Sequence, residues 1–502
     1  MSVSLTAQFS GGEGSDDNPY IIKTAADLVL LGTLVEEAND NFNNKCYKLG
    51  NDISLAAYQG GTGWKPIGYV GWFIDYAFHG VFDGDNKKIT GLVINNINRT
   101  YAGLFGAVTN GTVKNLTVEN VKIRAEYDIG GVAGYLENTT ISNCHTSGEI
   151  SGDDLMGYGG VVGSAYGSYI LDCHSTCKIN GTSSVGGVAG NLSNSSTMKN
   201  CYSTGEISGS GSVGGVVGSF NGKLSYCYST GNVTGGGNEI GGIVGSLDGG
   251  SVSNCYSTGD VIGYNVVGGV AGYVSNTGSV SNCYSTGKII GNPDRVGGIA
   301  GYVDWEYVSG TVSNCVALNP SVNATGTYVG RVAGLNDWGI LSNNAAYEGM
   351  ETIFGNTVWF HIGANREDGV NMSKQTIQTD GTLGYRFMSA YGWTTQNGKL
   401  PGLFGNTVDL PAHLRGGVGV EELKVENGEW KIYPNPTTRE LRIENGELKI
   451  ENVEIFDVYG RKIFNFQLSI FNSIDVSHLS AGVYFVKIHT AEGEVTQKVI
   501  KE

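Results

Sequence analysis

Four acidic side chains lie in two loops that are one sequence repeat apart: Glu126, Asp128, Asp153 and Asp154. If these loops stack, two of the carboxylates could stand ~5 Å apart, the separation that retaining glycoside hydrolases use for their acid and nucleophile. The same oxygens could instead hold Ca²⁺. A solvated acidic loop is the more frequent outcome for such a cluster, so catalysis is the weaker interpretation.

A column of aromatic residues recurs at the repeat period and contains His145, His174, Tyr202, Tyr228, Tyr256 and Tyr284. Each follows a cysteine, and neighbouring strand residues face opposite sides, so the rings point outward if the cysteines point inward. Such a row could stack on sugar rings, but a ladder that stabilises coil stacking is the favoured interpretation. The two histidines lack a nearby carboxylate, so we predict no metal site.

A second aromatic set falls in one inter-strand loop on adjacent repeats. It consists of Trp305, Tyr307 and Trp338, beside Asp304, Glu306 and Asp337. Aromatic rings with carboxylates suit carbohydrate recognition, whereas packing under a distal cap would explain the same residues equally well. The chain contains no H-E-x-x-H, G-x-S-x-G, P-loop or dinucleotide-binding motif, and we expect no cofactor.

The cysteines form a column of their own: Cys144, Cys173, Cys201, Cys227, Cys255, Cys283 and Cys315. Stacked strands would bring successive members close enough for disulfides. Every cysteine would then have two equivalent neighbours, and cysteine also packs well as a small buried hydrophobe. We therefore favour a buried ladder of free thiols over disulfides, and a linear ladder does not suit a tetrahedral metal site.

These columns exist because the chain repeats itself about every 28 residues. One unit, VGGVVGSFNGKLSYCYSTGNVTG (Val213 to Gly235), holds short β-branched runs separated by Gly, Asn and Ser. Three strands and three turns fit one coil of a β-helix, which buries its apolar face only against neighbouring coils. The sequence predicts an all-β solenoid of about nine three-strand coils, with a β-propeller as the competing architecture.

A further column consists of Asn115, Asn143, Asn200, Asn254, Asn282, Asn314 and Asn343. Amides stacked one coil apart can hydrogen-bond along the axis of the solenoid. Asp172 and Tyr226 occupy the same column. We expect the amide ladder to be broken at both.

Composition and charge exclude several classes of protein. The 502 residues include 80 Gly and carry a net charge of −16, which disfavours nucleic-acid binding. With 40% hydrophobic residues the chain can build a core.

No apolar run is long enough for a transmembrane segment. The first residues lack the basic and apolar segments of a signal peptide, so we expect an export leader to have been removed or to precede this start.

A solenoid has open ends that need caps. Residues 1–100 are expected to hold the N-terminal cap and first coils, with a capping helix that starts at Thr24. Residues 101–348 carry the repeat, 349–413 form a distal cap, and 414–429 are a linker. The cap is predicted from its bulky residues: Trp359, Phe360, Tyr385, Phe387, Tyr391, Trp393 and Phe404.

The repeat resembles the GLUG repeat of bacterial surface proteins, with AGLFG at 102–106 as the nearest match to its core. DNPYIIKTAADLVLL and FHGVFDGDNKKITGLVI resemble the segment that precedes such repeats, so the resemblance spans roughly residues 15–348. It implies a solenoid and a surface role, since the family includes proteins regarded as adhesins. The repeats also occur in immunoglobulin A peptidases, but their activity is not implied without a zinc motif.

Residues 430–502 read as a small C-terminal β-sandwich domain. The ordered segments YPNP, VEIFDVYGRKI and IDVSHLSAGVYFVKI, followed by a basic last strand, are similar to the type A sorting domain of the type IX secretion system. Matching positions are Tyr433, Pro434, Asn435, Pro436, Gly482 and Tyr484. The resemblance implies two partners, the type IX machinery and its sortase-like protease, and display on or release from a Gram-negative outer membrane.

Two functional hypotheses remain open. Uniform repeats favour a surface adhesin or structural stalk, which could bind glycans or extracellular proteins. The acidic loops favour a polysaccharide-processing β-helix enzyme, either a hydrolase or a lyase. Binding without turnover would support the first hypothesis, and turnover would support the second.

Overall fold

The computed structural model describes residues 9–37, 40–71, 74–153, 156–304, 309–352, 358–415, 431–433, 436–444, 450–457, 461–466, 473–490 and 493–502. Spatial proximity divides the chain into two compact units, Met1–Leu414 and Arg415–Glu502. The first unit holds the repeats and the second holds the C-terminal β-strands.

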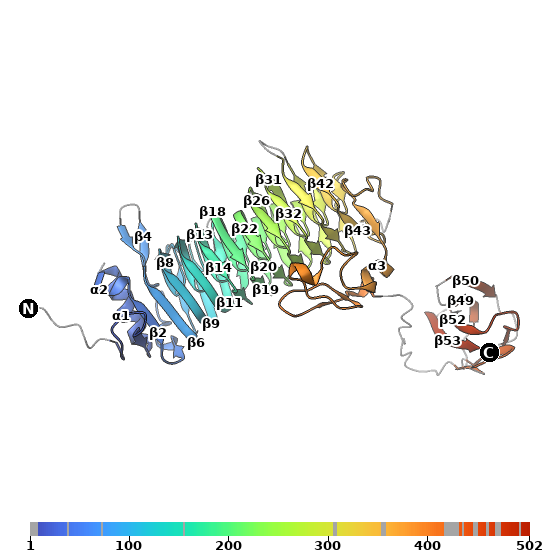
Figure 1. Cartoon of the computed structure of the whole chain (residues 1–502), viewed down its shortest axis with the longest axis horizontal. Coiled ribbons are helices and arrows are strands. Elements are labelled where there is room, and N and C mark those ends of the chain that lie inside the picture. Colours follow the sequence, from blue (N-terminus) through green and yellow to red (C-terminus); the bar gives the residue numbers. More distant parts are fainter. Residues whose placement is uncertain are drawn as a thin grey trace, which may run out of the picture. The chain divides into compact units, whose positions relative to one another are not determined.

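The first unit is a parallel β-solenoid whose coils stack along the chain (Figure 1). Thirty-five of its strands are joined in one continuous sheet, and seven form a second. The fold prediction is confirmed, although the solenoid has about 12 turns rather than nine. The first coils lack the glycine pair at the corner where the regular coils carry it. Residues that pair between neighbouring first coils are also separated by varying numbers of residues, as in Tyr20 with Tyr47 and Phe82 with Val113.

The first coils are closed by helix α1 (Ala25–Glu36), which is followed by α2 (Asp40–Asn43). Thr24 caps α1 as expected, because its hydroxyl accepts from the Asp27 N–H while the Asp27 carboxylate accepts from the Thr24 N–H. Leu28 and Leu31 are fully buried in the same core as the coils. The helix thus covers apolar surface that the first coil would otherwise expose.

A regular coil contains five short strands where we expected three. They are β25 (Asn238–Gly241), β26 (Val244–Asp248), β27 (Ser251–Ser253), β28 (Tyr256–Ser257) and β29 (Val261–Ile262). The next coil repeats them as β30 (Asn265–Gly268), β31 (Ala271–Ser275), β32 (Ser279–Ser281), β33 (Tyr284–Ser285) and β34 (Ile289–Ile290). Tyr256 pairs with Tyr284 and Val261 with Ile289, so each column stacks on itself.

Two kinds of corner divide the apolar runs. Between β27 and β28 the chain turns at Asn254, whose φ is 54°, a left-handed conformation that Asn tolerates better than most residues. Between β25 and β26 the turn is a glycine pair. In the preceding coil, a Cβ on Gly214 would lie 1.9 Å from the Val217 carbonyl oxygen, and one on Gly215 would lie 2.2 Å from that of Gly242. Neighbouring backbones therefore exclude side chains at this corner.

The distal end is closed by a buried arginine. Arg331 stands where regular repeats carry the second glycine of the pair, and it is 1% exposed. Its guanidinium donates to the carbonyl oxygens of Tyr347 and Gly369, both at 3.3 Å. Strand β44 (Val370–Met372) then adds one last parallel strand beside β43 (Ala345–Tyr347).

Residues 374–414, named here the returning segment, run back along the side of the coils, as the orange ribbon in Figure 1 shows. The segment contains α3 (Lys374–Thr379), η2 (Ser389–Tyr391), β45 (Lys399–Leu400), β46 (Val408–Asp409) and η3 (Ala412–Leu414). The Tyr284 hydroxyl donates to the Pro401 carbonyl oxygen at 2.6 Å. At the far end His413 Nε2 lies 2.7 Å from the Leu318 carbonyl oxygen. Much of the expected distal cap is therefore a side cover.

The second unit is built from two antiparallel sheets. One contains β47 (Lys431–Tyr433), β48 (Glu440–Glu444) and β51 (Ser473–Asp475). The other contains β49 (Ile450–Asp457), β50 (Lys462–Phe466), β52 (Gly482–Thr490) and β53 (Gly493–Lys501). Ile443 and Ile474 from the first sheet share a buried core with Ile455 and Val486 from the second, which confirms the β-sandwich.

Candidate functional site

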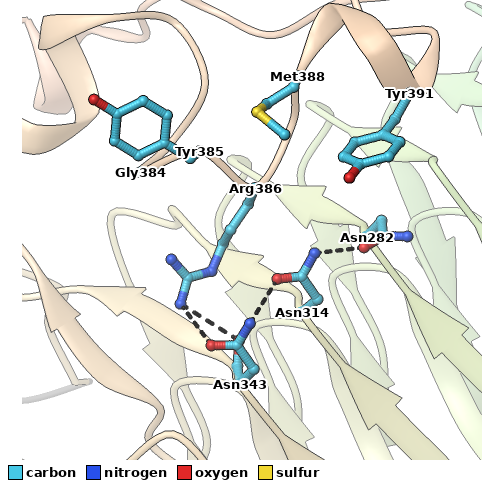
Figure 2. Close-up of a pocket in the computed structure, with 8 residues that line it drawn as sticks. All are labelled: Asn282, Asn314, Asn343, Gly384, Tyr385, Arg386, Met388 and Tyr391. Carbon is cyan, nitrogen blue, oxygen red and sulfur yellow. Dashed lines mark hydrogen bonds between the residues drawn. The ribbon is translucent and has the colours of Figure 1, made fainter.

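The asparagine column forms hydrogen-bonded ladders, because its members share one left-handed corner on successive coils. Asn343 Nδ2 donates to Asn314 Oδ1 at 2.9 Å, and Asn314 Nδ2 donates to Asn282 Oδ1 (Figure 2). Tyr226 interrupts the column as predicted, since a phenol ring stands in place of the amide. The predicted break at Asp172 is wrong on one side, because Asp172 accepts from Asn200 at 2.9 Å.

Arg386 of the returning segment ends this ladder. Its Nη2 donates to the Asn343 carbonyl oxygen at 3.4 Å and to Asn343 Oδ1 at 3.3 Å. Its Nε is buried without a hydrogen-bond partner among the described residues. Partial burial lowers the pKa of Arg386, and the pKa of an arginine is high enough for the guanidinium to remain a cation.

Arg386 and the three asparagines line a cleft of about 470 Å³ between the coils and the returning segment (Figure 2). The other lining residues are Gly384, Tyr385, Met388 and Tyr391. Tyr385 is 76% exposed and Tyr391 is 57% exposed. The cleft thus combines exposed aromatic rings with amide and guanidinium donors, and none of the described residues that line it carries a carboxylate.

A tight turn places these residues over the ladder. Leu383, Gly384 and Tyr385 all have positive φ, and the Tyr385 N–H donates to Thr382 Oγ1 at 2.8 Å. Leu383 is fully buried, so the turn is anchored in the core. Gly392 ends η2 with a φ of 84°, and a Cβ there would lie 2.8 Å from the Tyr226 ring. Tyr226 therefore serves as a contact for the returning segment.

The predicted tyrosine column is a continuous stack. Strands β15 (His174–Ser175), β19 (Tyr202–Ser203) and β23 (Tyr228–Ser229) continue through β28 and β33. Ring centroids of Tyr202 and Tyr228 lie 4.7 Å apart, and those of Tyr256 and Tyr284 lie 5.2 Å apart, with interplanar angles of 4° and 5°. The rings stand outside the coil, opposite the buried cysteines.

The returning segment covers half of this stack. Trp393 packs on Tyr256 and Tyr284, with ring centroids 6.3 and 6.0 Å apart, and Phe387 packs edge-on against Tyr284. Tyr256 is 6% exposed and Tyr284 is fully buried. These two rings are therefore not on an open stacking surface. Tyr202 and Tyr228 remain half-buried beside Phe404.

The two histidines continue the stack at its uncovered end. Their ring centroids lie 3.7 Å apart, and His174 stacks on Tyr202 at 4.5 Å. Burial lowers the pKa of His174 to about 4 and also lowers that of His145. Both rings are therefore neutral at pH 7. Within the described part of the chain, no group of three or more His, Cys, Asp or Glu gathers as a metal site.

The four acidic residues of the two loops have different surroundings. Asp153 accepts from Arg124 at 2.6 Å and is exposed, and Asp154 lies outside the described residues. Asp128 is half-buried and hydrogen-bonded by Ser164 Oγ. Burial raises the pKa of Asp128 to about 7. Glu126 is also half-buried, two residues before it.

The second aromatic set is only partly described. Trp305 and Tyr307 lie outside the described residues. Trp338 is 74% exposed with a φ of 64°, and its carbonyl oxygen accepts from Ser309 Oγ at 3.0 Å. Whether these aromatics act together remains a prediction.

The cysteine column is the innermost of the three consecutive columns Asn, Cys and Tyr. All seven members are fully buried, and all nine cysteines of the chain are free thiols. The Cys227 N–H donates to Cys255 Sγ at 3.4 Å, and Cys255 Sγ donates to the Ser253 carbonyl oxygen at 3.1 Å. Complete burial raises the pKa of Cys255 well above its ordinary value, because the thiolate would be desolvated.

The sorting-signal positions lie in the second unit. Tyr433 ends β47, Gly482 begins β52, and the Tyr484 hydroxyl donates to the Ser480 carbonyl oxygen at 2.9 Å. Pro436 is exposed, while Pro434 and Asn435 lie outside the described residues.

Sequence reasoning missed the cleft. Tyr385 and Tyr391 were expected to pack within a cap, and Arg386 was not singled out. The one sequence feature that could have pointed to these residues is the aperiodic, aromatic-rich segment that follows the last repeat. Nothing in that signal indicates which column of the solenoid the segment would cover.

Comparisons with known proteins agree with this architecture. A family model described as the GLUG motif matches residues 125–151, 181–208, 236–262 and 263–290, and one described as a secretion system C-terminal sorting domain matches residues 431–502. A protein of Evansella cellulosilytica whose name describes it as a Gly-rich membrane protein is 40% identical over 123 residues. Halomucin of Haloquadratum walsbyi is 32% identical over 154 residues.

These two matches cover 24% and 30% of this chain, but only 13% and 2% of the relatives themselves. Among the described residues, no helix is long and apolar enough to cross a membrane. The sorting domain indicates an extracellular or cell-surface protein that is handled by the type IX secretion system. The chain is a GLUG-repeat β-solenoid protein with a C-terminal sorting domain of the type IX secretion system.

Proposed function

We propose that this chain is a non-catalytic adhesin that binds glycans in the cleft between the asparagine ladder and the returning segment. The observation that carries the proposal is the lining of that cleft. Tyr385 and Tyr391 expose rings that can stack on sugar faces, and the Asn and Arg side chains supply donors for hydroxyl oxygens. None of the described lining residues offers a carboxylate as acid or base for glycosidic cleavage.

The solenoid would act as a stalk that presents this cleft. Each coil hydrogen-bonds to its neighbours along several parallel columns, so the cleft rests on regular sheets rather than on isolated loops. The type IX sorting domain is expected to be removed by a sortase-like protease, which would leave the solenoid as the mature surface form.

A glycan array probed with the full chain, combined with a reducing-sugar assay, tests this proposal. We expect binding without turnover, and a loss of about tenfold or more in affinity for Tyr391→Ala, because the stacking ring is removed. Tyr169→Ala is the matched control, since Tyr169 is 52% exposed and stacks in register four coils away from Ser279, three residues before Asn282. The proposal fails if no glycan binds, or if both variants weaken binding equally.

A second candidate function, polysaccharide hydrolysis, has one observation in its favour. Asp128 has a pKa raised to about 7, which suits a general acid at neutral pH. Its weakness is that Asp153, another member of the predicted acidic cluster, is paired with Arg124. Reducing ends that are released by the full chain and abolished by Asp128→Asn would favour the enzyme over the adhesin.

A further inference from the structure

The hydrogen bonds that line the cleft all run in one direction. A guanidinium has donors and no acceptor, so Arg386 can meet only the oxygen of the Asn343 amide. The Asn343 nitrogen must then face Asn314, and the Asn314 nitrogen must face Asn282. The orientation of all three amides follows from the single cation at the end of the row.

This row ends in a donor. Asn282 Oδ1 accepts from Asn314, which leaves Asn282 Nδ2 without a partner among the described residues, at the edge of the cleft (Figure 2). Each bond in such a chain polarises the next, so a cation at one end strengthens the donor at the other. The cleft therefore presents hydrogen-bond donors at both ends.

The charge of Arg386 is not neutralised within the cleft. Nη2 is taken up by Asn343, and Figure 2 shows the other terminal nitrogen pointing away from that residue. In the described part of the chain no carboxylate forms an ion pair with this guanidinium, and none lines the cleft. This positive site stands out in a chain whose net charge is −16.

We propose that the cleft selects acidic glycans, in which a sugar carboxylate binds the free terminal nitrogen of Arg386 and a sugar oxygen accepts from Asn282. A ligand carboxylate would supply the missing counter-charge, and charge-assisted bonds of this kind are stronger than neutral ones. Tyr385 and Tyr391 would hold the sugar rings between these two polar ends. The inference rests on the proposed glycan-binding function and adds the chemical class of the ligand.

The test compares oligomers of galacturonate, glucuronate and mannuronate with the same oligomers after reduction of each carboxyl to an alcohol. Affinities for the full chain are measured by calorimetry at low salt. We expect at least one uronate to bind about tenfold more tightly than its reduced form, which corresponds to ~1.4 kcal/mol. Raising the salt concentration should shrink that preference.

Two variants assign the preference to the cleft. Arg386→Gln should abolish the preference for uronates, and Asn282→Asp should do so independently by placing a negative charge at the donor end. Asn282→Asp keeps the oxygen that accepts from Asn314 and suits the left-handed corner, so it remains informative if Arg386→Gln fails to fold. Lys223→Gln, an exposed site on another strand, controls for the change in net charge.

The outcomes separate the two proposals. If uronates and their reduced forms bind equally, or if the preference survives in both cleft variants, the acidic-glycan inference is overturned while glycan binding stands. If neither series binds and the glycan array is also negative, the proposed function fails and the inference fails with it.

Discussion

Two columns of side chains run along the outside of the same coils, one residue to either side of the buried cysteines, and they are used differently. Asn282, Cys283 and Tyr284 are consecutive residues. Tyr284 is fully buried by the returning segment, whereas Asn282 lines an open cleft beneath that segment. The aromatic column packs under the returning segment, whereas the amide column lines the cleft in which we propose that a ligand binds.

The difference shows that a repeated column has no fixed role until a non-repeating segment covers part of it. Tyr256 and Tyr284 look like Tyr202 in the sequence, yet they pack under Trp393 and Phe387. Apolar rings have most to gain from being covered, because burial removes a large area from water. Exposed amides can hydrogen-bond to water, so leaving them solvated costs less free energy. The cleft between the coils and the returning segment lies over their column.

Breaking the covered end of the aromatic column should have the largest effect. We expect Tyr284→Ala to lower the free energy of unfolding of the first unit by ~3–5 kcal/mol, the usual cost of truncating a buried aromatic residue. It removes the contacts with Phe387 and Trp393 and the hydrogen bond to Pro401. Denaturant unfolding measures the change.

Tyr202→Ala is the matched control for the less deeply covered part of the column, where Phe404 is the neighbouring ring of the returning segment. Its ring stacks in the same column but is only half-buried, so we expect a loss of less than ~1 kcal/mol. Equal losses for the two variants would contradict the division of this column into a buried part and a half-buried part.

Polar substitutions in the cysteine column, which lies between the asparagine and tyrosine columns, should destabilise the first unit. Cys255→Ser should cost ~1–3 kcal/mol, since it buries a hydroxyl among apolar side chains. In the native protein a thiol reagent should reach at most Cys46, the one cysteine of the nine that is not buried, and should reach all of them after denaturation. Native disulfides found by mass spectrometry would refute the free-thiol ladder.

The uncovered end of the aromatic column should make stability depend on pH. The pKa of His174 is lowered to about 4 in the folded chain, against ~6.5 unfolded. Between these values the unfolded chain binds more protons at His174, so the contribution of His174 to stability is complete above pH 6.5 and falls as the pH drops towards 4. We expect a loss of ~1–2 kcal/mol once solvent screening is allowed for.

His174→Tyr should flatten this pH dependence, because it replaces the titrating ring with the residue that the column carries elsewhere. Thermal unfolding between pH 4 and 7 provides the measurement. An unchanged slope in the variant would assign the dependence to other groups.

Removing the second unit should have the smallest effect. A chain that ends at Leu414 keeps every coil and the whole returning segment, so we expect its thermal midpoint to be unchanged. In the producing cell the same truncation should abolish surface display. A large drop in the midpoint would make the second unit a structural cap instead of a sorting domain.

Much of this architecture could be predicted from the sequence because it repeats. The coil, the inward cysteines and the amide ladder are each a local pattern, such as Asn254, Cys255 and Tyr256, multiplied along the chain. The break at Asp172 was predicted too strictly, since a carboxylate can accept from one side but cannot donate to the other. The coil count was low because the first coils do not keep a constant spacing.

The candidate site could not be predicted, because it depends on one long-range contact. Arg386 meets Asn343 only after a turn at Leu383 to Tyr385 brings the returning segment back onto the coils. Asn343 belongs to a periodic column but Arg386 does not, and the lining residues come from three coils and an aperiodic segment. The position in which the returning segment docks depends on tertiary contacts, which the local sequence pattern does not predict.

Hydroxyl-radical footprinting of tyrosines, read by mass spectrometry with and without a uronate oligomer, tests the two columns most directly. In the free chain Tyr284 and Tyr256 should be protected while Tyr385 and Tyr391 react. Adding the oligomer should protect Tyr385 and Tyr391 and leave Tyr202 unchanged. Rapid labelling of Tyr284 in the free chain, or protection of Tyr202 and Tyr228 in place of the cleft tyrosines, would contradict the assignment.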